Sequence, residues 1–128
     1  IAVYDDVVKK QPKNIVAHNN LAWLYLEQKN IDKALRHAEK AFELAPHIAN
    51  IVDTYSQVLL GSGDKVVALK HATEAFELSK GKDVDIQLNY AEALIANSHL
   101  DEAKNTLAKV ITKTDEQQDK KSKLLTQL

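Results

Sequence analysis

The 128-residue sequence contains no cysteine, only two prolines and only three glycines. The lack of cysteine excludes disulfide bonds and thiolate metal sites, although it does not decide the cellular compartment. Proline and glycine interrupt helices, so their scarcity favours a chain that is helical over most of its length.

The sequence also lacks a charge imbalance and a long apolar run. The sequence has 17 Lys and Arg residues and 18 Asp and Glu residues, and the pI is about 6.6. This balance gives no general electrostatic reason to bind nucleic acid or an anionic membrane surface. A spanning helix needs about 18 consecutive apolar residues, and no run approaches that length, so we expect no direct membrane insertion of this fragment. The 45% of hydrophobic residues are enough to build the core of one globular unit.

Patterns typical of catalysis and metal binding are missing as well. Gly61-Ser62-Gly63 lacks the third glycine and the Gly-Lys-Ser/Thr ending of phosphate-binding loops, and we predict a turn between helices. The five histidines form no His-x-x-x-His pair, and no serine has a Gly-x-Ser-x-Gly context. We expect His37 and His71 to be packed partly buried. The sequence therefore predicts no enzyme, no cofactor and no metal site, unless catalytic residues lie outside this segment.

What the sequence does contain is a unit of about 34 residues that recurs three times. The clearest copy, 15–48, holds two amphipathic runs joined by Lys29-Asn30 and ends near Pro46. Ala34 of its second run recurs as Ala68 and Ala103, in steps of 34 and 35 residues. A fixed period of this length with two helices per unit predicts stacked helical hairpins. The expected helices are 1–10, 15–28, 31–45, 49–61, 65–79, 84–97, 100–113 and 116–127, and Thr114 with Gln117 forms a capping-box pair before the last.

This pattern resembles the tetratricopeptide repeat (TPR) family, whose units carry apolar, small and aromatic residues at fixed positions. The matching residues are Leu21, Ala22, Tyr25, Ala34, Ala41 and Pro46 in the first unit, Tyr55, Ser56, Ala68 and Ala75 in the second, and Tyr90, Ala91 and Ala103 in the third. The resemblance implies an all-α, right-handed α-solenoid in a single domain, 1–128. We expect full repeats at 15–48, 49–82 and 84–117, with partial repeats at 1–12 and 118–128, as in a segment of a longer solenoid. The shared alanines, Ala34, Ala41, Ala68, Ala75 and Ala103, should be buried where helices meet.

In the TPR family, side chains at set positions of each first helix line a concave groove that binds an extended peptide or a partner helix. Carried over to this sequence, the groove residues are Asn19, Asn20, Trp23, Glu27, Asp53, Gln57, Leu60, Asp85, Leu88, Asn89 and Glu92. Four of them are acidic and none is basic, and Lys123 of the last partial repeat is the only cation expected to oppose them. The resemblance therefore implies a groove that prefers neutral or basic segments.

Two known kinds of TPR groove can be compared with these positions. The clamp that holds the carboxylate of chaperone tails requires Lys, Asn and Lys where this sequence has Asn19, Trp23 and Asp85. It also requires Asn at Thr54 and Arg at Asn89, so we reject it. A ladder of asparagines that bond a ligand backbone fits Asn20 and Asn89, although both could equally be solvated or bond neighbouring helices. Trp23 could anchor a ligand in the groove or pack as core against the preceding helix.

The first unit also resembles, between Asn19 and Pro46, the repeats of bacterial TPR proteins associated with exopolysaccharide export and PEP-CTERM protein sorting. That resemblance implies a location in the cell envelope or periplasm. We predict a non-catalytic protein-interaction scaffold that is part of a larger protein. The alternative is a self-associating repeat module of an envelope secretion assembly, joined through Val66 and Val67, which replace the charged residues usual there.

Overall fold

The structure, a computed structural model, describes the backbone of residues 1–128 and every side chain except that of residue 2. Its helices are α1 (Ala2–Lys10), α2 (Ile15–Glu27), α3 (Ile31–Leu44), α4 (Ala49–Gly61), α5 (Lys65–Leu78), α6 (Val84–Ala96), α7 (Leu100–Ala108) and α8 (Asp115–Leu125). No strand occurs in this described range, which confirms the predicted all-α class. None of these helices is long and apolar enough to cross a membrane.

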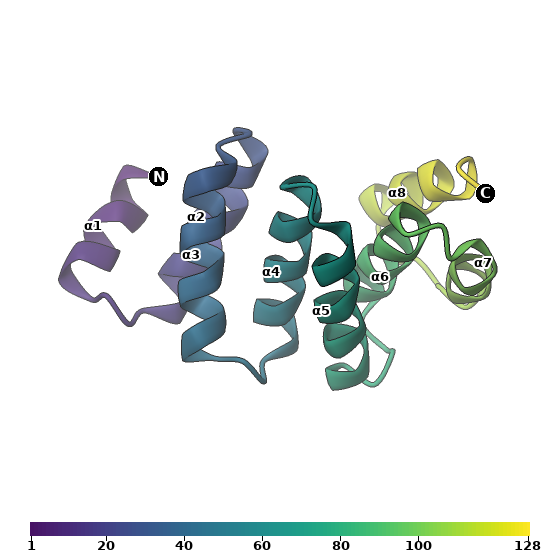
Figure 1. Ribbon diagram of the computed structural model, residues 1–128, viewed down its shortest axis with the longest axis horizontal. Coiled ribbons are helices and arrows are strands. Elements are labelled where there is room, and N and C mark those ends of the chain that lie inside the picture. The colour runs from purple at the N-terminus through teal and green to yellow at the C-terminus, as the bar shows by residue number, and fades with distance from the viewer.

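The helices form a row of antiparallel hairpins, α2 with α3, α4 with α5, and α6 with α7 (Figure 1). α1 lies at one end of the row and α8 near the other, so the two termini are far apart. Each first helix contacts the first and second helices of the preceding hairpin, as α4 does with α2 and α3. This stacking confirms the predicted α-solenoid.

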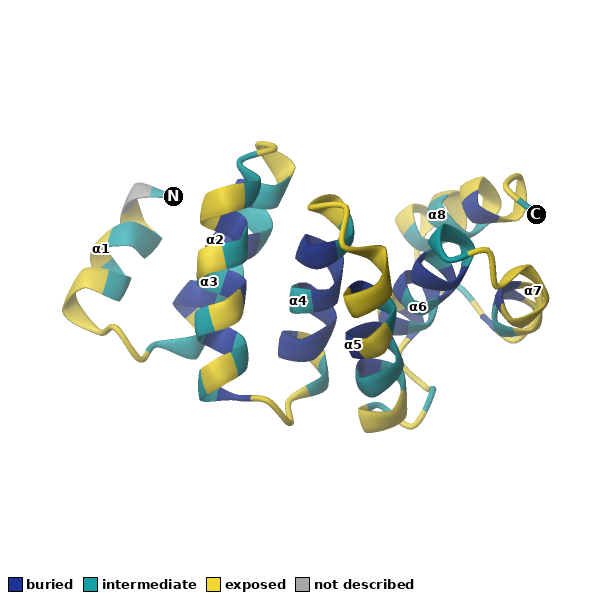
Figure 2. Cartoon of the chain, viewed as in Figure 1, coloured by how far each residue is buried: buried dark blue, intermediate teal, exposed yellow. Residues whose placement is uncertain are grey.

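Small residues set the spacing between the helices. The five alanines expected at the helix contacts are all buried, and all but Ala41 are completely inaccessible. Because an alanine side chain ends at its Cβ, two helix backbones approach closely at these points. The most continuous burial lies on α4, in the middle of the row (Figure 2).

Side chains and left-handed residues define where the helices begin and end. Asn30 caps α3 and Asp64 caps α5, each accepting the N–H of the residue three positions later. The turns after α2 and α6 place Lys29 (φ 60°) and Ser98 (φ 63°) in the left-handed region, where glycine is the residue of lowest cost. The N–H of the next residue then bonds the carbonyl five positions back, for example His99 N–H to Leu94 O at 2.8 Å.

The prediction for the seventh helix, 100–113, is wrong at its end, because α7 stops at Ala108. The following Val110-Ile111-Thr112 is a β-branched run that disfavours helix. Val110 turns inward and packs in the cluster that contains Leu107 and Leu124. The Lys121 ammonium donates to the Val110 carbonyl at 2.8 Å, which replaces a helical hydrogen bond.

The predicted cap of the last helix is present in modified form. Thr114 Oγ1 accepts the N–H of Gln117 at 3.1 Å. The return bond differs from a standard capping box, because Gln117 Oε1 accepts the N–H of Lys113 at 2.8 Å. α8 therefore begins at Asp115, and its first turn lies against α6.

Candidate ligand-binding groove

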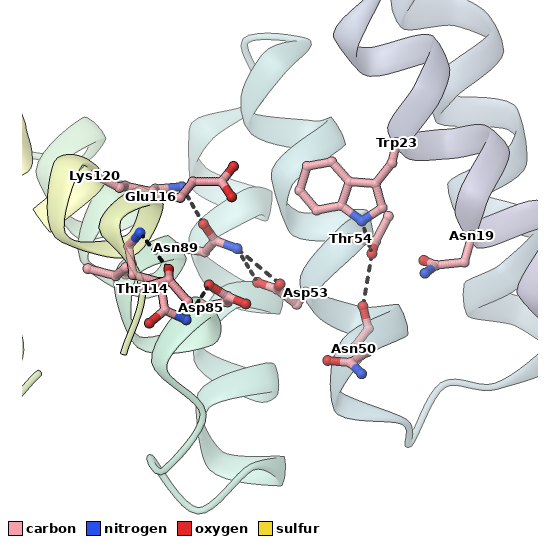
Figure 3. Close-up of a pocket in the computed structure, with 12 residues that line it drawn as sticks. Asn19, Trp23, Asn50, Asp53, Thr54, Asp85, Asn89, Thr114, Glu116 and Lys120 are labelled. Atoms are coloured by element: carbon pink, nitrogen blue, oxygen red, sulfur yellow. Dashed lines mark hydrogen bonds between the residues drawn. The ribbon is translucent and has the colours of Figure 1, made fainter. Parts of the chain in front are cut away.

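A cavity of about 570 Å³ opens on the face formed by the first helices α2, α4 and α6 and by α8. We call it the groove. Its lining residues are Asn19, Trp23, Asn50, Asp53, Thr54, Asp85, Leu88, Asn89, Thr114, Glu116, Gln117 and Lys120. Figure 3 shows Trp23 on one side of this space and Asn89 with Lys120 on the other.

Six of the eleven residues carried over from the family pattern line this cavity: Asn19, Trp23, Asp53, Asp85, Leu88 and Asn89. The other five, Asn20, Glu27, Gln57, Leu60 and Glu92, lie outside its lining. Leu88 borders the cavity but is only 1% exposed, because its side chain packs in the core with Leu107 and Leu124. Apolar contact in the groove therefore depends mainly on Trp23.

Trp23 faces the groove and is fixed there by a hydrogen bond between hairpins. Its indole N–H donates to Thr54 Oγ1 at 2.8 Å, and the Thr54 hydroxyl donates to the Asn50 carbonyl at 2.9 Å. The ring is partly exposed, so one surface remains accessible to a ligand. The sequence allows Trp23 either to face the groove or to pack as core against the preceding helix, and in the structure it faces the groove.

A chain of polar contacts, which we call the polar chain, runs across the groove through Asp53, Asn89, Lys120 and Glu92. The Asn89 Nδ2 donates to both carboxylate oxygens of Asp53, at 3.0 and 3.2 Å. The Lys120 ammonium donates to Asn89 Oδ1 and pairs with Glu92 Oε1 at 3.1 Å. Both polar ends of the Asn89 amide are therefore engaged within the protein. These contacts join α4, α6 and α8 (Figure 3).

Asp53 lines the groove but has a pKa well above that of an ordinary aspartate. The residue is only 7% exposed. Burial raises the pKa of Asp53 from 3.8 to about 7, while the hydrogen bond from Asn89 and the charge of Lys120 oppose the rise. The nearby carboxylates Asp83 and Asp85 raise it further. The buried end of the polar chain therefore gains or loses a proton near neutral pH.

Of the six further lining residues, Asn50 and Thr54 lie on α4 near Asp53. The other four were missed by the family pattern: Thr114, Glu116, Gln117 and Lys120. All four come from α8 or its cap, because the chain leaves α7 early and places α8 beside α6. The expectation that Lys123 faces the groove is wrong. Lys123 is exposed and is not part of the lining, and Lys120 supplies the cation instead. The spacing of Glu116, Lys120 and Leu124 marks one helix face and could have shown this rotation.

His37 and His71, for which we expect packing within the protein, both lie against neighbouring side chains. His37 is partly buried with its Nδ1 3.0 Å from His18 Nδ1, and His71 is buried with its Nδ1 3.1 Å from Glu74 Oε2. Among the described residues, no group of three or more possible metal ligands comes together.

Comparison with family models identifies two segments of the chain. Residues 15–48 and residues 59–128 each match a model described as "Tetratricopeptide repeat". The second match alone covers more than half of the chain. A search of curated proteins finds no match.

Several solved structures share the fold. TTC0263, a thermophilic TPR protein from Thermus thermophilus, superposes with a TM-score of 0.79 at 18% identity over 97% of this chain and 69% of its own. The structure described as the MamA RS-1 ArsTM double mutant superposes with a TM-score of 0.71 at 17% identity, over 98% of this chain and 64% of its own. YrrB, described as a TPR protein with an unusual peptide-binding site, superposes with a TM-score of 0.69 at 20% identity, over 98% of this chain and 73% of its own. With the sequence matches and the stacked hairpins, these likenesses lead to one conclusion: the chain belongs to the tetratricopeptide repeat family.

Proposed function

We propose that this chain is a non-catalytic scaffold that binds a neutral or basic extended segment of a partner protein in the groove. One observation carries the proposal, namely a partly exposed Trp23 opposite several carboxylates in a single cavity of about 570 Å³. TPR domains generally bind protein or peptide partners, and the description of YrrB is a precedent for peptide binding by this fold.

The preference for basic segments follows from the charges around the cavity. Asp53, Asp85 and Glu116 all line it, whereas Lys120 is the one basic residue among the described lining residues. Within the described residues, no Lys, Arg or His nitrogen lies within salt-bridge distance of those three carboxylates, and Lys120 pairs with Glu92 instead. A cationic side chain entering the groove therefore finds two exposed carboxylates without a bound counter-charge, those of Asp85 and Glu116. Asp53 is buried behind them and is only partly ionised near neutral pH.

The groove also offers groups suited to a peptide backbone. Asn19 Oδ1 is buried without a hydrogen-bond partner among the described atoms, and Asn50 is exposed at the cavity edge. An amide accepts and donates at once, so it matches a peptide group whatever the ligand side chain. Asn20 remains a predicted contact. Asn89 can hydrogen-bond a ligand only if it gives up its present bond to Asp53 or to Lys120.

The test uses Trp23, the only tryptophan, as its own reporter. End-capped Ser/Ala peptides that carry a central Lys, Ala or Glu are titrated while Trp23 fluorescence is followed at low and physiological salt. We expect the Lys peptide to bind most tightly and to weaken as salt rises, because exposed charges are screened beyond about 8 Å at physiological ionic strength.

The variant Asp85→Asn/Glu116→Gln should weaken the Lys peptide several-fold and leave the Ala peptide nearly unchanged. The control, Glu39→Gln/Glu77→Gln, removes the same number of negative charges from exposed positions outside the groove lining. Tightest binding of the Glu peptide, or an equal loss in both variants, would disprove the proposed groove selectivity.

Self-association is the second candidate function, because Val66 is 69% exposed and Val67 36% exposed at the start of α5. Adjacent exposed valines on a surface helix provide an apolar contact for a second copy. Light scattering over a dilution series decides between the two functions. A stable dimer that Val66→Lys/Val67→Lys dissociates, and that excludes peptide from the groove, would favour self-association. The cell-envelope location remains a prediction from the resemblance of residues 19–46.

A further inference from the structure

Lys120 differs from the other groove-lining residues in charge, and it comes from α8, as do Glu116 and Gln117. The three hairpins contribute carboxylates, amides, a hydroxyl and the indole, but the ammonium on the cavity wall comes from α8. α8 follows the last hairpin, after α7 ends at Ala108, and it contacts α6. The cation is therefore delivered to the groove by a separate element.

The partners of Lys120 are those that any basic side chain would use. Its ammonium contacts an amide oxygen of Asn89 and a carboxylate oxygen of Glu92, both on α6. Directly behind Asn89 lies the Asp53 carboxylate, held by the Asn89 amide N–H₂. A Lys or Arg side chain of a partner segment lying along the groove meets the same two acceptors.

The two layers of this arrangement differ in how firmly they are held. Asn89 and Asp53 are 6% and 7% exposed, so the receiving groups stay in place. The side chains of Lys120 and Glu92 are 35% and 37% exposed, and a half-exposed ion pair of this kind contributes about 1 kcal/mol or less. Release of Lys120 breaks this ion pair and the hydrogen bond to Asn89, both of which an incoming cation restores, and it does not require α8 to unfold, since Leu124 anchors that helix in the core.

We propose that Lys120 is an intramolecular competitor, which occupies at Asn89 and Glu92 the position taken by a Lys or Arg side chain of a bound partner. This inference rests on the proposed function of the groove. α8 thereby sets the affinity threshold for basic partners: a partner must displace Lys120 before its own cation reaches the polar chain.

The experiment compares Lys120→Gln with Lys123→Gln. Both variants remove one positive charge from α8, but Lys123 is exposed and lies outside the groove lining. Each is titrated with an end-capped Ser/Ala peptide carrying one central Lys, and with the same peptide carrying Met, which has similar length and no charge. Lys120→Arg keeps the charge and serves as the conservative variant.

We expect Lys120→Gln to raise the ratio of Lys-peptide to Met-peptide affinity by about fivefold, which corresponds to about 1 kcal/mol. Lys123→Gln and Lys120→Arg should keep the ratio of the parent chain. On addition of the Lys peptide to the parent, the side-chain N–H₂ signals of Asn89 in NMR spectra should shift, whereas the Met peptide should leave them in place.

An equal rise in the ratio of Lys-peptide to Met-peptide affinity in Lys120→Gln and Lys123→Gln would overturn the inference, because general charge attraction would then explain both. An unchanged ratio in Lys120→Gln, with peptide binding still dependent on Asp85 and Glu116, would also overturn it and leave the proposed function standing. If neither peptide binds the parent or Lys120→Gln, while circular dichroism shows folded protein, both the inference and the proposed function fail.

Discussion

At the scale of single residues, Asp53 combines burial with charge in a way that makes the protein's stability depend on pH. Its pKa is 3.8 in an ordinary setting and about 7 in the folded chain, mainly because of burial. Between these values the folded protein holds a proton at Asp53 that the unfolded chain has released. The contribution of Asp53 to the free energy of unfolding is therefore greatest at low pH and decreases as pH rises towards 7.

Asp53→Asn should consequently stabilise the protein more at pH 8 than at pH 5, by a difference of about 1 kcal/mol or more. Asparagine mimics the protonated acid and has no charge to bury, while its Oδ1 still accepts the bond from Asn89. Thermal unfolding of both proteins at the two pH values measures the difference. The charged groups that act on this site, Lys120, Asp83 and Asp85, are present in both proteins.

Glu116→Gln is the matched control, because Glu116 is an exposed carboxylate that lines the same groove and is not among the groups that shift the pKa of Asp53. It should not give the pH-dependent gain. The same increase in stability between pH 5 and pH 8 in both variants would mean that general charge repulsion, and not burial of Asp53, is responsible.

Residue positions in the groove could be predicted only in part. Trp23, Asp53 and Asn89 of the family pattern line the cavity, because their helices follow the repeat spacing. The pattern could not show that Asn89 is already bonded at both ends, since its partners lie 36 and 31 residues away on other helices. Hydrogen bonds between elements depend on rotamers and helix rotation, which the period of a sequence does not encode.

At the scale of helices, close packing depends on the small residues between hairpin partners. Ala68 of α5 is fully buried, and its carbonyl accepts the Ser56 hydroxyl of α4 at 2.9 Å. Ala68→Leu should lower the free energy of unfolding by about 1–3 kcal/mol through overpacking. Chemical denaturation measures the loss, with Ala108→Leu as the control at an exposed helical position. Equal stability of the parent and Ala68→Leu would contradict the close contact of α4 and α5.

A substitution at a helix end should raise stability instead of lowering it. Ser98 has φ 63°, and a non-glycine residue in this region costs about 1 kcal/mol or more. Ser98→Gly should therefore stabilise the protein by up to about 1 kcal/mol. Ser62→Gly is the control, because Ser62 has φ −80° and gains nothing from the freedom of glycine. Similar melting temperatures of the two variants would contradict the left-handed turn after α6.

The helices themselves are predicted well by the sequence except where local preference and tertiary packing compete. The first six begin and end within about two residues of expectation, since caps such as Asn30 and Asp64 mark their boundaries. α7 is the exception. Apolar spacing continues through Val110 and Ile111 and imitates a helix, but Val110 packs in the core from a segment outside the helix.

At the scale of the whole molecule, the row of hairpins distributes stability unevenly. α4 contacts α2, α3, α5 and α6, whereas the described contacts of α1 are with α2 alone. In a stacked array, stability is approximately a sum over neighbours, so an end helix opens first. Hydrogen exchange should show the weakest protection in α1 and the strongest in α4.

Tyr25→Phe tests the attachment of α1 directly, because the Tyr25 hydroxyl donates to the Asp5 carboxylate at 3.2 and 3.3 Å. It should speed exchange in α1 and leave α4 unchanged. Equal acceleration in both helices would mean that the chain opens as one cooperative unit.

The polar chain also has a mechanical consequence. It ties α4, α6 and α8 together on the groove side of the solenoid. Flexing that widens the groove stretches these bonds at once, and hydrogen bonds weaken steeply when lengthened or misaligned. Flexing that narrows the groove leaves them closed. As long as Lys120 keeps its partners, the C-terminal half of the molecule therefore resists widening of the groove more than it resists narrowing.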